Sequence, residues 1–137
     1  MSEKKIIAVE DVMSSSIYTI SSMATIREAV LLIKDKDVSS LVVERRDERD
    51  EYGILTIRDI ARDVLAQDRA PERTNVYEIM QKPILTIRRD MNIKYAVALL
   101  TRFGVSRSVV VDQESSPIGI VTLRDMVLGS ERIRLGS

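Results

Sequence analysis

The sequence predicts a mixed α/β protein of the α+β type, made of two tandem copies of one strand–helix–strand–strand–helix unit. Three observations support this prediction: an internal repeat, an alternation of β-rich runs with helix-patterned stretches, and a hydrophobic content of 45%, which suffices for a packed core. A unit of about 60 residues buries too little surface to be stable alone, so each copy is expected to pack against the other.

The internal repeat extends over most of the chain. A shift of 67 residues superimposes Met13 on Met80, and after the central strand the shift becomes 66. The matched pairs include Thr19/Thr86, Ile26/Ile93, Ala29/Ala96, Val43/Val110, Gly53/Gly119, Thr56/Thr122, Arg58/Arg124 and Asp59/Asp125. The change of shift falls inside the charged stretch 44–51, whose counterpart in the second copy is 112–116. Both are predicted to be hairpin loops, where length changes cost little free energy.

Two capping boxes mark the helices of the first copy. Thr25 with Glu28 opens one helix, and Thr56 with Asp59 opens the other. The predicted elements are a strand at 17–20, a helix from 26 to 33, strands at 39–43 and 52–55, and a helix at 57–65.

The second copy repeats this order. Its predicted elements are a strand at 84–87, a helix at 92–103, strands at 106–112 and 118–121, and a helix at 122–128. The 92–103 helix is apolar on nearly every side, which predicts burial on more than one side. Its second side would be covered within the monomer, by the other repeat or otherwise, or by a second chain.

These elements predict four segments. They are a first repeat at 8–66, a polar linker with a proline at 67–74, a second repeat at 75–129, and a C-terminal tail at 130–137.

The composition excludes several functional classes. The chain has no cysteine and no histidine, so thiol catalysis, Ser–His catalysis and the usual metal ligands are absent, and we expect no enzymatic activity. Lys+Arg and Asp+Glu are both 21, which together with few aromatic residues argues against nucleic-acid binding. No signal peptide or membrane span is visible, so a cytoplasmic protein is expected.

The repeated segment that could carry chemistry is Gly-x-x-Thr-x-Arg-Asp. Here a strand turns directly into a helix, whose first-turn amides are expected to lack partners and to attract a phosphate. Arg58 and Arg124 would add positive charge, and Asp59 and Asp125 could accept hydrogen bonds from a ribose diol. A Thr-x-x-Asp segment is also an ordinary capping box, but a cap does not require the repeated arginine.

These segments resemble the CBS (cystathionine β-synthase) domain family over residues 8–66 and 75–129. The resemblance also includes a Met-x-x-Pro start at Met80–Pro83 and a Gly-Val-Ser-Arg segment at 104–107. Asp37 departs from the family pattern, which often has glycine there. The resemblance implies two repeats with pseudo-twofold symmetry, ligand clefts between the repeats, and frequent homodimers.

The resemblance also implies a regulatory ligand, such as AMP, ADP or ATP, with no obligatory cofactor. The ligand-binding candidates are Lys82, Pro83, Ile84, Ser106, Arg107, Thr122, Arg124 and Asp125 in the second copy, and Ser16, Ile17, Ser40, Thr56, Arg58 and Asp59 in the first. Because the second copy carries Lys82 and Arg107, it is expected to be the more basic site. Asp125→Ala should therefore weaken AMP binding more than Asp59→Ala.

The functional hypothesis is an energy-sensing module that binds AMP, ADP or ATP. Two alternatives stay open at this point: an S-adenosylmethionine sensor, and a ligand-free dimerisation scaffold that regulates an unidentified protein target.

Overall fold

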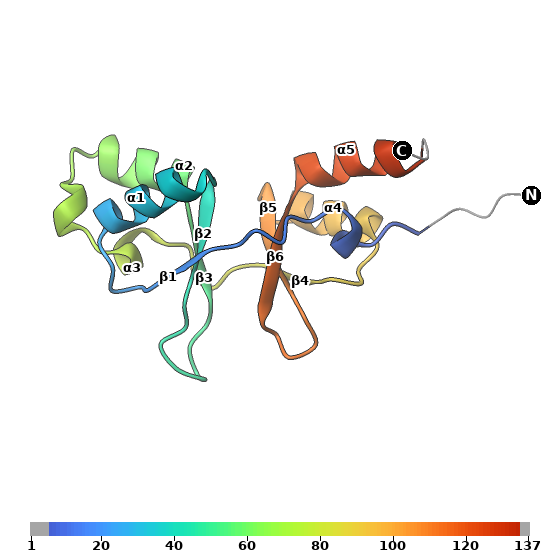
Figure 1. Cartoon of the computed structure of the whole chain (residues 1–137), viewed down its shortest axis with the longest axis horizontal. Helices are drawn as coiled ribbons and strands as arrows, with labels where there is room; N and C mark the ends of the chain where they lie inside the picture. Colours follow the sequence, from blue (N-terminus) through green and yellow to red (C-terminus); the bar gives the residue numbers. More distant parts are fainter. Residues whose placement is uncertain (1–5, 135–137) are drawn as a thin grey trace, which may run out of the picture. The chain divides into compact units, whose positions relative to one another are not determined.

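The computed structural model describes residues 6–134, and the side chains of residues 6–130. Within this range the chain forms two compact units, each with a three-stranded sheet (Figure 1). The middle unit contains residues 18–84. The terminal unit contains residues 6–17 together with residues 85–134.

The middle unit begins with β1 and ends with a short helix. Its elements are β1 (Thr19–Ile20), α1 (Ile26–Lys36), β2 (Ser40–Val43), β3 (Gly53–Thr56), α2 (Ile57–Ile60), the π-helical turn η2 (Ala61–Leu65), the 3-10 turn η3 (Pro71–Arg73) and α3 (Val76–Ile79). The sheet order is β1-β2-β3. β1 runs parallel to β2, with Thr19 opposite Val42, and β3 runs antiparallel to β2, with Ile54 opposite Val42.

The terminal unit has the same topology. Its elements are η1 (Val9–Asp11), β4 (Thr86–Arg88), α4 (Ile93–Arg102), β5 (Arg107–Val111), β6 (Pro117–Thr122) and α5 (Leu123–Arg134). In the sheet β4-β5-β6, Thr86 lies opposite Val109, and Val109 lies opposite Ile120. These are the positions that the repeat shift predicts from the middle unit, so the two copies share one strand register.

The structure confirms the predicted fold class and changes several boundaries. β1 covers only residues 19–20 of the predicted 17–20 strand. The last helix continues to Arg134 and takes in residues 130–134 of the predicted tail. The short helices η1, η3 and α3 were not predicted, because three or four residues are too few to show a helical period.

Each compact unit combines one copy with the leading segment of the other. In the terminal unit, the Val9 amide donates to the Met91 carbonyl at 2.8 Å. In the middle unit, the Val76 amide donates to the Ala24 carbonyl, also at 2.8 Å. The repeat shift relates these two bonds. The compact units are therefore offset from the sequence repeats at 8–66 and 75–129.

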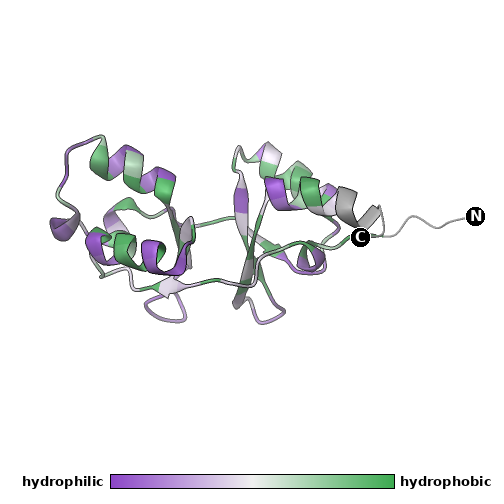
Figure 2. Ribbon diagram, turned by 45° about the horizontal axis from the view of Figure 1, so that its top comes forward, coloured by the Kyte–Doolittle hydropathy of each residue, from purple (hydrophilic) through white to green (hydrophobic). Residues whose placement is uncertain are grey.

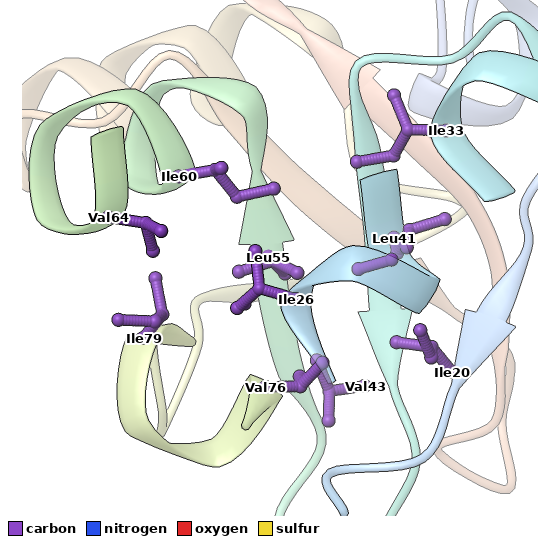
Figure 3. Packing of buried hydrophobic residues seen from close by; sticks show 11 residues of the cluster. Ile20, Ile26, Ile33, Leu41, Val43, Leu55, Ile60, Val64, Val76 and Ile79 are labelled. Carbon is purple, nitrogen blue, oxygen red and sulfur yellow. The ribbon is translucent and has the colours of Figure 1, made fainter. Parts of the chain in front are cut away.

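The helices of each unit bury one apolar side on the sheet. In the middle unit, Ile26, Ala29 and Ile33 of α1 lie at helical spacing and are buried. They belong to one cluster with Leu41 of β2 and Leu55 of β3, which are fully buried (Figure 3). Hydrophilic residues occupy other sides of the helices (Figure 2). The buried core of the terminal unit consists of Val9, Ile87, Ala96, Leu100, Val110, Val121 and Met126.

Several apolar side chains stay outside these cores. In α4, Ala96 and Leu100 are buried, but Tyr95 is 61% exposed. In α1, Leu31 is 56% exposed. Burial of these helices wholly within the monomer is thus not observed, and cover by a second chain stays a prediction.

The predicted apolar stripe at 57–65 is also only partly buried. Ile60 and Val64 lie in the core, while Ile57 and Leu65 are exposed. The helix changes from α to π geometry at Ala61, so residues spaced for one continuous α-helix no longer share a single side.

Candidate functional site

The repeated Thr-x-x-Asp segments form matching helix caps. In the middle unit, Thr56 Oγ1 accepts a hydrogen bond from the Asp59 amide at 3.1 Å, and Asp59 Oδ2 accepts one from the Thr56 amide at 3.0 Å. In the terminal unit, Thr122 Oγ1 accepts from the Asp125 amide at 2.9 Å, and Asp125 Oδ2 accepts from the Thr122 amide at 3.1 Å. The capping boxes predicted for Thr56 with Asp59 and for Thr25 with Glu28 are both present, and Thr122 with Asp125 forms a third.

The first-turn amides of both helices were expected to lack hydrogen-bond acceptors in the protein, and for most of these amides the expectation is wrong. The Ile57 amide donates to the Ser39 carbonyl at 3.0 Å, and the Leu123 amide donates to the Ser106 carbonyl at 2.9 Å. The capping threonines take the aspartate amides. Only the amides of Arg58 and Arg124 then lack an acceptor in these turns among residues 6–134.

The carboxylate of Asp59 is fully occupied by the protein itself. Its side chain is only 1% exposed. Besides the Thr56 amide, it accepts hydrogen bonds from Thr56 Oγ1 at 2.8 Å and from Arg62 Nη2 at 3.1 Å. Gln81 Nε2 donates to both of its oxygens, at 3.0 and 3.1 Å. A ribose diol would have to displace one of these donors to reach Asp59.

The carboxylate of Asp125 is only partly occupied. Oδ2 accepts from the Thr122 amide, whereas Oδ1 has no hydrogen-bond donor within the described part of the chain. The residue is half-buried rather than buried. Asp125 can therefore accept a hydrogen bond from a ligand without losing one from the protein.

Two substitutions between the copies explain this difference. Arg62 corresponds to Leu128 under the 66-residue shift, and Gln81 corresponds to Ser14 under the 67-residue shift. Neither Leu128 nor Ser14 makes a side-chain bond to Asp125. Sequence reasoning missed Arg62 and Gln81, although a comparison of the copies around the motif contains the signal.

Arg58 and Arg124 occupy the second position of their helices. Both side chains are exposed, and neither guanidinium group forms an ion pair with the side chains described at residues 6–130. Arg124 thus places a positive charge, without an ion-pair partner among the described side chains, one residue before Asp125 on the same helical turn.

Lys82 is held by an acidic partner. Its ammonium group forms an ion pair with Asp50 in the hairpin loop of the middle unit. The hydrogen bond from Lys82, together with one from the Arg46 amide, holds the pKa of Asp50 well below its usual range. Lys82 belongs to the same compact unit as Asp59, and Asp125 belongs to the other unit. Lys82 therefore adds no positive charge within the unit that contains the Asp125 turn.

The other candidates divide between the units as follows. Pro83, Ile84, Ser40, Thr56 and Arg58 lie with Asp59 in the middle unit; Ser16, Ile17, Ser106, Arg107, Thr122 and Arg124 lie with Asp125 in the terminal unit. Ser40 is buried in β2, and Ser106 is exposed before β5. The roles of these residues in ligand binding stay predictions.

The described residues give no sign of a metal centre or a membrane segment. No group of three or more acidic residues among them could hold a metal ion. No helix in the same range is long and apolar enough to cross a bilayer.

A comparison with protein families decides the assignment. The CBS domain model matches residues 9–66 and 76–130. The chain belongs to the CBS domain family. Its two copies are the two CBS domains of a pair.

Similar proteins agree with this assignment. CBS domain-containing protein YhcV of Bacillus subtilis is 34% identical over 122 residues, which cover 88% of this chain and 84% of YhcV. The hexameric CBS-CP12 protein from bloom-forming cyanobacteria is 32% identical, with a TM-score of 0.88 over 95% of this chain and 71% of its own. The CBS domain pair of protein MJ0100, solved with 5′-methylthioadenosine and S-adenosyl-L-methionine, is 28% identical, with a TM-score of 0.76 over 96% of this chain and 98% of its own.

Several curated relatives are longer than this chain. It spans 61%, 45% and 38% of the lengths of three uncharacterized proteins that it also matches. The CBS pair is therefore the part that they share with it.

Proposed function

We propose that this CBS domain pair is a non-catalytic regulatory module that binds an adenosine-containing ligand through the turn from Thr122 to Asp125. Two observations on one helical turn carry the proposal: among the described residues, Oδ1 of Asp125 accepts no hydrogen bond, and the preceding residue, Arg124, forms no ion pair. A carboxylate oxygen accepts hydrogen bonds from a ribose diol, and a guanidinium group binds a phosphate or carboxylate in bidentate geometry. One helical turn thus offers Asp125 to bind the ribose and Arg124 to bind the anionic group of such a ligand.

The ligand class we propose is AMP, ADP or ATP, with AMP first. Arg124 supports this choice because a nucleotide phosphate provides the anion that a guanidinium group prefers. The alternative is S-adenosylmethionine, supported by the presence of that molecule and 5′-methylthioadenosine in the similar MJ0100 pair. Both share the ribose diol for Asp125, and they differ in the group that would meet Arg124.

A second candidate function is a self-associating scaffold without a small ligand, which acts on an unidentified protein target. It is supported by exposed apolar side chains: Leu31 of α1 is 56% exposed, and Tyr95 of α4 and Phe103, directly after α4, are each 61% exposed. We propose that these helices contribute to a homodimer. Leu31→Glu should then reduce the mass measured by light scattering to that of a monomer, and an unchanged mass would contradict the dimer proposal.

Calorimetric titration tests the ligand proposal. AMP, ADP, ATP and S-adenosylmethionine are titrated into the chain, with GTP as the specificity control. Asp125→Ala should abolish or strongly weaken binding, and Asp59→Ala should leave the affinity of the folded protein within a few-fold. Asp90→Ala is the matched control, because Asp90 is an exposed carboxylate of the same unit, 71% accessible.

A thermal-shift series provides an independent check. A ligand at 100 times its dissociation constant should add about 2.7 kcal/mol to the free energy of unfolding. If no adenosine-containing compound shifts the melting temperature, the ligand proposal fails and the scaffold candidate takes its place.

A further inference from the structure

We propose that Arg62 and Gln81 together form a clamp: they donate hydrogen bonds to the Asp59 carboxylate and so keep it from binding a ligand. Each chain would then bind one adenosine-containing ligand instead of two. The inference rests on the proposed function and adds to it the number of sites and the residues that set this number.

The clamp uses the oxygens of Asp59 that a ligand would need. Gln81 Nε2 bridges both oxygens at 3.0 and 3.1 Å, and Arg62 Nη2 reaches Oδ1 at 3.1 Å. Thr56 supplies two further hydrogen bonds to Oδ2. A carboxylate offers about four lone-pair positions, so five donor contacts leave none for a ribose hydroxyl.

Further hydrogen bonds hold both clamp residues in place. Arg62 is fixed by Asp63, which accepts hydrogen bonds from Arg62 Nε at 3.0 Å and from Nη2 at 2.9 Å. Gln81 is fixed by its backbone, which exchanges two hydrogen bonds with Ile54 of β3 at 2.9 and 3.0 Å. Because these contacts hold both residues in place, less side-chain entropy is lost when they bind Asp59.

Arg62 and Gln81 could serve only to stabilise the helix cap instead of blocking a ligand. The terminal unit distinguishes these two roles. There Thr122 and Asp125 form the same reciprocal cap, while Ser14 and Leu128 stand where the clamp residues would be. The cap is thus complete without an arginine or a glutamine. The clamp is an addition to the cap that only one copy carries.

The experiment transplants the clamp to the other unit. The double variant Ser14→Gln/Leu128→Arg places the clamp residues beside Asp125. Its matched control, Ser15→Gln/Val127→Arg, introduces the same side chains at neighbouring exposed positions. The probes are AMP and S-adenosylmethionine, measured by calorimetric titration with circular dichroism as the check on folding.

The wild-type chain should bind one equivalent of AMP or S-adenosylmethionine. The transplanted clamp should weaken that binding at least about tenfold, the loss expected when a ligand must displace a charge-assisted hydrogen bond. The control should bind like the wild type. Two equivalents bound by the wild type, or an unchanged affinity of the transplant, would overturn the clamp.

A readout without any ligand separates this inference from the proposed function. Carbodiimide coupling followed by mass spectrometry should label Asp125 and spare Asp59 in the wild type. In Arg62→Leu/Gln81→Ser, Asp59 should become labelled at a rate at least several-fold higher. Equal labelling of Asp59 before and after the change would overturn the clamp, whereas a protein that binds neither probe but shows the labelling change would overturn only the ligand proposal.

Discussion

Gly119 of β6 lies directly against Met13, so closely that a Cβ atom at position 119 would come within 2.7 Å of the Met13 sulfur. The same atom would lie 2.7 Å from the Ser14 carbonyl oxygen, which accepts a hydrogen bond from the Ile120 amide at 2.9 Å. The glycine of the Gly-x-x-Thr segment therefore lets the leading segment of the chain pair with β6. Gly53 has the same relationship to Met80 and Gln81, with contacts of 3.1 Å.

Gly119→Ala should lower the free energy of unfolding by about 2–3 kcal/mol, because the added methyl group must push backbone as well as a side chain. Gly53→Ala should cost about 1 kcal/mol, since its contacts are looser. Denaturant titration gives both values. A Gly119→Ala protein as stable as the wild type would show that the leading segment does not press on β6.

The two motif aspartates should differ in their effect on stability. Asp59→Ala leaves the Arg62 guanidinium and the Gln81 amide without their buried acceptor, so it should cost about 2–3 kcal/mol. Asp125→Ala removes only a helix cap and should cost about 1 kcal/mol. Thermal unfolding without ligand measures the difference, and equal losses would refute it.

The ion pair between Asp50 and Lys82 predicts a pH dependence of stability. Because the folded protein lowers the pKa of Asp50, the unfolded state binds the proton more readily. The stabilisation is present above about pH 4, the range of an unperturbed aspartate, and is lost as the pH falls below it.

Asp50→Asn should therefore be less stable than the wild type at pH 7, and the gap should narrow as the pH falls from 4 towards 2. Urea titrations at pH 7, 4 and 2 check this. Glu48→Gln is the control, because Glu48 is an exposed acidic residue of the same loop, and its gap to the wild type should be small at every pH. A gap for Asp50→Asn that stays constant across these pH values would exclude the ion pair as its source.

A left-handed residue ends the first long helix of each copy. Asp37 has a φ of 54° and Gly104 a φ of 67°, so Asp37 keeps the backbone conformation for which the family pattern has glycine. No atom lies within 4 Å of a Cβ built on Gly104. Gly104→Ala should therefore cost about 1 kcal/mol from backbone strain alone.

Gly104→Asn should recover part of that loss, because asparagine tolerates the left-handed region better than alanine. The melting temperatures of the two variants give the comparison. An alanine variant that melts above the asparagine variant would count against a strained backbone at this position.

The fold was predictable because its signals are local and occur twice. Thr25 and Thr56 mark the starts of helices through their capping boxes. The repeat shift between the two copies locates the hairpin of each copy. The leading segments were harder to place, since nothing near Val9 or Val76 indicates which sheet each one joins. That choice depends on contacts between residues far apart in the sequence.

The site was predictable in its residue types and not in its occupancy. The motif identified Asp59 and Asp125 as equivalent carboxylates, and their caps are indeed the same. Their difference comes from Arg62 and Gln81, which lie outside the motif and reach Asp59 only through the fold. The motif was found from the residues that the two copies share, so it could not reveal Arg62 and Gln81, which only one copy has.

The exchange of leading segments has a consequence for chain cleavage. A single proteolytic cut between residues 67 and 74 would yield two fragments, each holding a piece that the other needs to complete its core. Such fragments should remain bound in size-exclusion chromatography and separate only in denaturant. The two fragments would then stay associated through the cores that they complete in each other, although the peptide that connects them is cut.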